Sequence, residues 1–108
     1  MAEIDGAMVG WACISPLSER AAYKITGETS FYVKSEFRGR GIGVKLKRQI
    51  TAEARRLGYH SLIARVAEGS AASLHINKAA GYRHVGTMRE VGRKFGKLLD
   101  VHILQKIL

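Results

Sequence analysis

The N-terminal part of the chain alternates apolar and polar residues as β-strands do. Asp5-Gly6 is typical of a two-residue hairpin turn and stands between two short apolar arms. The second arm, Ala7 to Ile14, has apolar residues on both sides, which predicts a strand buried on both faces. One side carries Val9, Trp11 and Cys13, and the other carries Met8, Ala12 and Ile14. After a connector, Ile25 to Val33 predicts a further strand.

From Ile42 to Leu57 the apolar period changes to that of an α-helix. Apolar residues recur at Leu46, Ile50, Ala54 and Leu57. Gly58 is suited to end this helix in the left-handed conformation. The polar residues of the segment are expected at its surface, namely Lys45, Lys47, Arg48, Glu53, Arg55 and Arg56.

After this helix, the apolar run His60 to Ala67 predicts a central parallel strand. Ser70 is expected to cap the helix Ala71 to Ala80, which ends at Gly81. The C-terminal part then predicts two strands joined by a basic, glycine-containing loop. These segments are Tyr82 to Val91, Gly92 to Asp100 and Val101 to Leu108, with the loop in the middle.

The predicted order is β-β-β-α-β-α-β-β, an α/β fold with a mixed central sheet. A chain of 108 residues, nearly half of them apolar, predicts a single domain over 1–108. The strand-helix-strand unit over 25–67 is expected to be a right-handed parallel crossover. Ligands of such units bind beyond the carboxyl ends of the strands.

Composition narrows the choice of function. No apolar run is long enough to span a bilayer, and the first ten residues do not resemble a signal peptide, so no membrane partner is expected. A single cysteine favours a reducing cytoplasm. The net charge of +9 favours polyanionic ligands. Nucleic acid is one candidate, but the basic residues are scattered and no nucleic-acid-binding motif appears.

The run Arg38-Gly39-Arg40-Gly41-Ile42-Gly43 lies between a predicted strand and a predicted helix. Glycines allow positive φ and close approach of a ligand, and a helix N-terminus carries partial positive charge. The flanking arginines add fixed charge, so the turn predicts a diphosphate site. Its spacing is neither that of a P-loop nor that of a dinucleotide fingerprint, since the glycines run G-x-G-x-G. Arginine-glycine tails of RNA-binding proteins are the alternative, but this run is not repeated.

The spacing R-x-x-G-x-G of Arg38, Gly41 and Gly43 resembles the acetyl-CoA signature of the GNAT superfamily of N-acetyltransferases. From Val9 onward, the chain resembles the phosphinothricin and methionine sulfoximine N-acetyltransferase branch of this superfamily. The resemblance is carried by the segments 28–33, 38–43, 72–75, 80–82 and 89–101. The resemblance implies transfer of acetyl from acetyl-CoA to the amino group of a small amino-acid-like acceptor.

By this resemblance, backbone groups of Phe31, Tyr32 and Val33 hold the pantetheine arm, and a backbone N–H near Val33 stabilises the thioester oxyanion. Glu28 matches the candidate general base, because an ammonium group must lose a proton before it can attack a carbonyl. An ordinary surface glutamate is the alternative reading. The implied cofactor-binding residues are Phe31, Tyr32, Val33, Arg38, Gly39, Arg40, Gly41, Ile42, Gly43, Ser70 and Asn77.

Three positions depart from the branch pattern. Ser70 stands where the family usually has an asparagine, and Asn77 stands where relatives carry a tyrosine or histidine that serves as a candidate acid. Leu99 replaces a histidine of some members. The four histidines have no ligand spacing, so no metal site is expected.

The family's first strand and two helices are also missing, so the fold is expected to be partial at its N-terminus. Those helices form one wall of the acceptor pocket, which leaves a choice between a fragment and a wall supplied by a dimer. A homodimer is expected from the resemblance. The alternatives are an acetyl-CoA-binding module that does not catalyse or needs a partner chain, and a basic nucleic-acid-binding domain.

Overall fold

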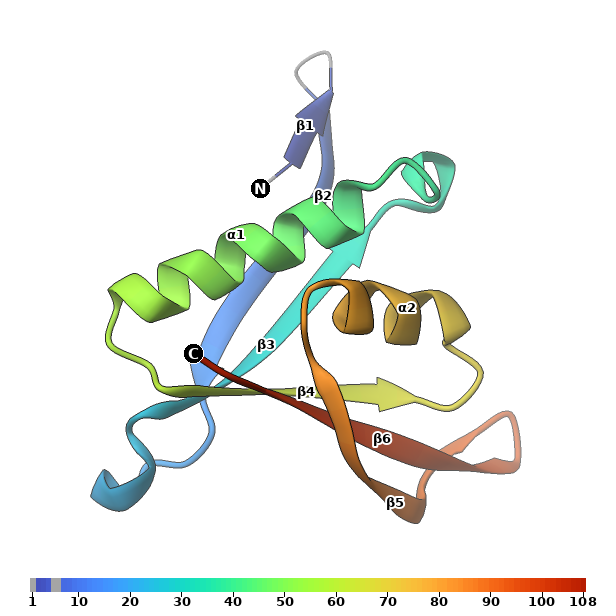
Figure 1. Cartoon of the computed structure of the whole chain (residues 1–108). Coiled ribbons are helices and arrows are strands. Elements are labelled where there is room, and N and C mark those ends of the chain that lie inside the picture. Colours follow the sequence, from blue (N-terminus) through green and yellow to red (C-terminus); the bar gives the residue numbers. More distant parts are fainter. Residues whose placement is uncertain (1, 5–6) are drawn as a thin grey trace.

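The computed structural model describes residues 2–4 and 7–108. The predicted element order is confirmed over these residues, which form six strands and two α-helices (Figure 1). The predicted turn Asp5-Gly6 lies outside the described residues. The strands are β1 (Ala2–Ile4), β2 (Ala7–Pro16), β3 (Thr26–Val33), β4 (Ser61–Ala67), β5 (Arg83–Lys94) and β6 (Lys97–Ile107). The helices are α1 (Ile42–Arg56) and α2 (Ala71–Ala79), with short 3-10 turns at Ala21–Tyr23 and Ser35–Phe37.

The strands form one mixed sheet in the order β1-β2-β3-β4-β6-β5. The predicted parallel pairing joins β3 and β4, and the remaining neighbours are antiparallel. Parallel strands need a crossover connection, and here α1 supplies it. The carboxyl ends of β3 and β4 therefore lie at the same edge of the sheet.

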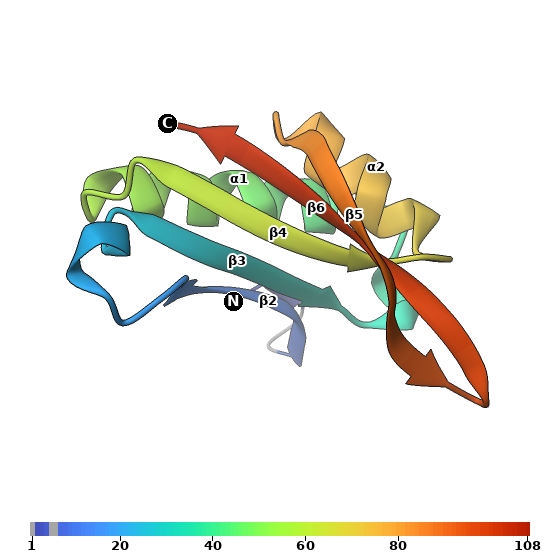
Figure 2. The same ribbon diagram turned by 90° about the horizontal axis from the view of Figure 1, so that it is seen from below.

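Both helices cover the same face of the sheet (Figure 2). The core forms where Ala54 of α1 and Ala80, at the end of α2, meet the inward side chains of the central strands. Those side chains are Leu62, Ala64 and Val66 of β4 and Leu104 of β6, and Tyr82, just before β5, packs with them. Burying apolar area of this kind contributes about 25 cal/mol per Å² to folding.

The prediction that the Ala7 to Ile14 strand is buried on both faces is confirmed at Val9, which is fully buried, but is wrong at Trp11 and Cys13. Gly10 and Ala12 lie on the face that α1 covers, next to their cross-strand partners Val33 and Phe31. Trp11 and Cys13 lie on the other face and are exposed. No described helix covers that second face. The Trp11 ring stacks on Tyr32 there, with ring centroids 6.2 Å apart. Side chains alternate across a strand, so covering one face leaves the other open.

The predicted loop over 92–100 is also wrong. Strands β5 and β6 continue through it as a hairpin, and Lys94 pairs with Lys97 around the turn Phe95-Gly96. Both turn residues have positive φ, 52° and 73°, as in a type I′ turn, whose twist matches that of the strands. The pairing includes residues of the predicted loop, since Gly92 lies opposite Leu99 within the ladder.

The ends of both helices agree with the sequence predictions, except for the cap at Ser70. Helix α1 ends at Arg56, and Gly58 adopts the expected left-handed conformation with φ 92°. Ser70 stands at the N-cap position of α2, but its side chain makes no capping hydrogen bond. In the part of the chain that the structure describes, neither helix combines the length and the apolar content needed to cross a bilayer.

Candidate active site at the fork between two parallel strands

Strands β3 and β4 pair only at their beginnings. The pairing stops at Glu28 and Ile63, although β3 continues to Val33 and β4 to Ala67. Figure 1 shows the two strands diverging beyond this fork. Strand β3 remains paired with β2 up to Val33, so its edge facing β4 is open over residues 29–33. Unpaired backbone groups of this kind offer hydrogen bonds to an extended ligand.

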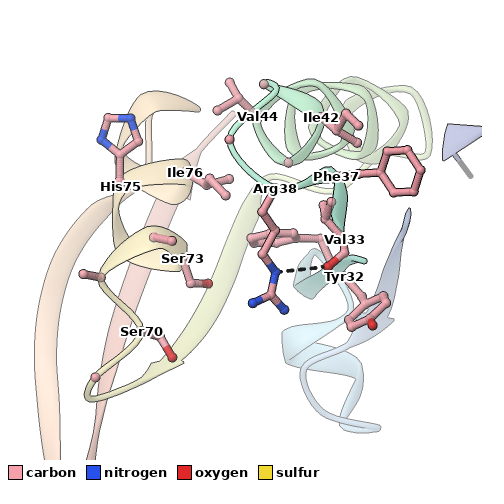
Figure 3. Close-up of a pocket in the computed structure, with 17 residues that line it drawn as sticks. Tyr32, Val33, Phe37, Arg38, Ile42, Val44, Ser70, Ser73, His75 and Ile76 are labelled. Atoms are coloured by element: carbon pink, nitrogen blue, oxygen red, sulfur yellow. Dashed lines mark hydrogen bonds between the residues drawn. The ribbon is translucent and has the colours of Figure 1, made fainter. Parts of the chain in front are cut away.

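A cleft of about 700 Å³ opens beyond the fork (Figure 3), within the range usual for small-molecule sites. Its walls are the end of β3, the turn before α1, the start of α1, and the N-terminal half of α2 with the loop before it. The lining residues are Phe31, Tyr32, Val33, Phe37, Arg38, Gly39, Gly41, Ile42, Gly43, Val44, Gly69, Ser70, Ala71, Ala72, Ser73, His75 and Ile76.

The turn before α1 has the backbone that its glycines permit. Gly39 and Gly41 have φ of 80° and 77°, a region in which a side chain is strained. Open space surrounds both α-carbons on the side where a Cβ would stand. Gly41 is also the N-cap of α1, and the first-turn residues Ile42 and Gly43 line the cleft. This arrangement presents a helix N-terminus to the cleft, which is suited to an anion.

Gly43 serves packing as well as the cleft. A Cβ at Gly43 would lie 2.6 Å from the Cδ1 atom of Ile76 on α2, closer than any ordinary contact. The missing side chain therefore lets the two helices approach, which brings both of their N-terminal halves to the cleft.

Arg38 connects the turn to the end of β3. Its Nε donates a hydrogen bond of 3.2 Å to the carbonyl oxygen of Val33. Figure 3 shows the guanidinium in the space between β3 and α2, with Ser70 and Ser73 across from it. A fixed cation thus lies beside the helix N-terminus, so the cleft favours negatively charged ligands.

Three of the residues predicted for the site lie elsewhere. Arg40 does not line the cleft, and its guanidinium lies 5.0 Å from the centroid of the Phe37 ring. Asn77 is buried behind the cleft at 1% exposure. Its Nδ2 donates to the carbonyl oxygen of Ser73, and its Oδ1 has no hydrogen-bond partner. Glu28 stands at the fork, outside the cleft.

Glu28 belongs to the face of the sheet opposite the helices, and Arg65 of β4 lies beside it. Glu28 Oε2 and Arg65 Nε are 3.1 Å apart, and their side chains are 27% and 54% exposed. The ion pair spans the fork, because Arg65 follows Ile63, the last paired residue of β4, by two positions. A carboxylate and a cation therefore stand where the two strands separate.

Sequence reasoning missed much of the α2 wall. Ser73, His75 and Ile76 line the cleft, but none of them is among the predicted ligand contacts. Two signals were available: Ser73 and His75 lie in the segment 72–75 that carries the family resemblance, and all three residues follow the strand that runs parallel to β3. In the described part of the chain, no group of three or more histidine, cysteine, aspartate or glutamate side chains is placed to hold a metal ion.

Lys47 lies directly behind the cleft, and the prediction that it sits at the surface is wrong. It is 0% exposed, and its Nζ donates a 2.6 Å hydrogen bond to Thr29 Oγ1. Nζ also lies 5.6 Å from the ring centroid of Phe31, which lines the cleft, and 4.5 Å from that of Tyr82. Burial lowers the pKa of Lys47 to about 8, because the charged form loses its hydration.

The hydroxyl groups around Lys47 form a small buried network. The Tyr82 hydroxyl lies 3.2 Å from both Thr29 Oγ1 and Thr51 Oγ1, and Thr51 Oγ1 also donates to the carbonyl oxygen of Lys47. Burial raises the pKa of Tyr82. The network gives the lysine polar partners inside an apolar layer, which limits the cost of its burial.

Comparisons with known proteins agree on one family. Residues 1–82 match the acetyltransferase (GNAT) family. An L-methionine sulfoximine/L-methionine sulfone acetyltransferase of Pseudomonas aeruginosa is 34% identical over 100 residues, which are 93% of this chain and 58% of that protein. A phosphinothricin N-acetyltransferase of Streptomyces coelicolor is 39% identical over 94 residues, 87% of this chain and 55% of that protein.

A solved structure has the same fold. It is an acetyltransferase from Salmonella typhimurium with its cofactor acetyl-CoA, and it superposes with a TM-score of 0.95 at 33% identity. The match covers 98% of this chain and 61% of that one. The chain thus spans 55–61% of the length of these three proteins.

Proposed function

Because the chain belongs to the acetyltransferase (GNAT) family, we propose that it transfers the acetyl group of acetyl-CoA to the amino group of a small amino acid. The names of the relatives favour acceptors such as methionine sulfoximine, methionine sulfone or phosphinothricin. The observation that carries the proposal is the cleft beyond the fork, between the end of β3 and α2, with a glycine turn and a helix N-terminus at one end.

The residues of the cleft fit the parts of acetyl-CoA. The anionic diphosphate suits the turn from Arg38 to Gly43, because the open space at Gly39 and Gly41 admits a ligand close to the backbone. The pantetheine arm suits the edge of β3 at Phe31, Tyr32 and Val33, which pairs with β2 on one side and has no strand partner on the side toward β4. Ser70 adds a hydroxyl group from the opposite wall.

When bound, acetyl-CoA supplies the reactive thioester. The Val33 N–H is proposed to donate to the thioester oxygen and to stabilise the charge that develops there. Glu28 is proposed to take a proton from the acceptor's ammonium group, directly or through water. The amine nitrogen then bonds to the acetyl carbon as the carbon–sulfur bond breaks. Asn77 cannot act as an acid, so the thiolate leaves as the anion or takes its proton from water.

A second candidate is an acetyl-CoA-binding module that needs a partner chain to select its acceptor. The exposed face that carries Glu28 favours it, because no described helix covers that face. We further propose a single domain over 1–108, a cytoplasmic location and a homodimer. The edge strand β5, with its exposed Val85 and Val91, and the exposed Phe95 in the turn after it support pairing through the β5–β6 hairpin.

Two measurements test the proposal. Acetyl-CoA at millimolar concentration should raise the melting temperature of the full chain, since a ligand that binds only the folded state stabilises it. Thiol release in the presence of methionine sulfone or phosphinothricin should then follow. An unchanged melting temperature would reject both candidate functions, whereas a shift without thiol release would favour the second.

A further inference from the structure

The ion pair between Glu28 and Arg65 occupies an unusual place in the fold. Glu28 is the last residue of β3 that pairs with β4, and Arg65 lies just past the corresponding point on β4. Both side chains lie on the face opposite the helices, because Leu62, Ala64 and Val66 of β4 face the core. The pair therefore stands on the opposite side of the sheet from α1 and α2, at the point where the strands separate.

Arg65 keeps donors free beyond this pair. A guanidinium has five N–H donors, and the contact with Glu28 is made through Nε. Among the described residues, Arg65 has no other hydrogen-bond or ion-pair partner, and its side chain is 54% exposed. Its antiparallel neighbour on β6 is Ile103, which is apolar. The two terminal nitrogens thus remain available to an anion from solution.

We propose that Arg65 binds the α-carboxylate of the acceptor amino acid while its amino group faces Glu28. This inference rests on the proposed function and names the substrate class of the same site. An amino acid carries its ammonium and carboxylate groups on one carbon, so the groups that bind them must be neighbours. Glu28 and Arg65 are neighbours of opposite charge at the fork. Their charges are complementary to the ammonium and carboxylate groups of the acceptor.

The proposal predicts a preference for free amino acids over amides, esters and peptide N-termini. In the latter compounds the carboxylate is missing or displaced, so Arg65 would be left without its second anion. Hydrogen bonds to charged groups are strong enough to give a difference in affinity of about tenfold or more.

The test measures acceptor binding to the full chain saturated with CoA, by isothermal titration calorimetry. L-methionine sulfone and its carboxamide are the two probes. The wild type should bind the acid about tenfold more tightly than the amide. Arg65→Gln should abolish this preference and leave the amide affinity within twofold, while Arg65→Lys should retain part of it. Arg56→Gln is the matched control, since Arg56 is also an exposed arginine paired with a glutamate, Glu53.

Each outcome separates the inference from the proposed function. If CoA itself does not bind, the proposed function fails. If CoA binds but the wild type does not prefer the acid, or Arg65→Gln keeps the preference, the Arg65 inference alone is rejected. Melting curves of the variants confirm that they fold. Loss of binding of both probes by a folded Arg65→Gln variant would also overturn the inference and assign Arg65 a structural role.

Discussion

The buried Lys47 leads to a prediction that is opposite to the usual effect of a core substitution. We expect Lys47→Met to stabilise the protein at neutral pH. Lys47 is fully buried on the inner side of α1, among Thr29, Phe31 and Tyr82. Methionine is also unbranched and flexible, so it fills similar space without the charge. Thr29 Oγ1 loses one donor but keeps its contact with the Tyr82 hydroxyl.

The magnitude follows from the lowered pKa of Lys47, about 8 against an ordinary value of 10.5. At pH 7 the lysine is charged in both states, and the shift corresponds to a cost of about 3 kcal/mol for holding the charge in the fold. Subtracting about 1 kcal/mol for the lost hydrogen bond leaves a net stabilisation of about 2 kcal/mol. For a domain of this size, that gain raises the melting temperature by roughly 10 °C.

The pH dependence has a definite sign. Between about pH 8 and 10.5 the unfolded chain holds a proton on Lys47 that the folded chain has released, so stability rises with pH in this window. From pH 7 to 9.5 the wild type should gain about 2 kcal/mol from this group. Tyr82 opposes the trend only above its ordinary pKa of 10, because burial raises its pKa.

The assay is urea denaturation at pH 7 and pH 9.5 for the wild type, Lys47→Met and Lys45→Met. Lys45 is exposed on the same helix, so its variant should keep the wild-type rise in stability. Lys47→Met should be more stable at pH 7 and lose the rise. A Lys47→Met variant that is less stable than the wild type at pH 7, or that keeps the full rise, would refute the reasoning.

Three further predictions concern the cleft and the sheet. Glu28→Gln should lower kcat by about a hundredfold or more, with acetyl-CoA affinity nearly unchanged, since it removes a proton acceptor; steady-state kinetics with an unaltered kcat would exclude Glu28 as the base. Arg38→Gln should weaken acetyl-CoA binding by about tenfold in calorimetry, because it removes a cation beside the glycine turn; equal affinity would place the diphosphate elsewhere. Gly10→Ala should cost about 2 kcal/mol in urea denaturation, since its Cβ would lie 2.6 Å from the backbone oxygen of Tyr32. The control Gly86→Ala, with open space around its Cα, should be close to neutral, and equal losses in both variants would contradict the steric argument.

Features that depend on neighbouring residues were readable from the sequence. The limits of α1, the left-handed Gly58 and the glycine turn before the helix all follow from backbone preferences within a few residues. The order of elements and the parallel pairing of β3 with β4 also follow, because a helix between two strands favours a parallel crossover. The glycine turn pointed to the cleft for the same local reason.

Burial and pairing between distant segments were decided only by the tertiary structure. Lys47 looks like a surface lysine because the pattern marks position 46 as inward, yet the buried stripe of α1 also includes positions 47 and 51. The β5–β6 hairpin replaced a predicted loop because pairing with a partner strand outweighs weak local propensity. The contact of Glu28 with Arg65 joins residues that no spacing relates, and the exposure of Trp11 depends on which face the helices cover. Local sequence specifies backbone conformation, whereas side-chain surroundings arise from segments that meet only on folding.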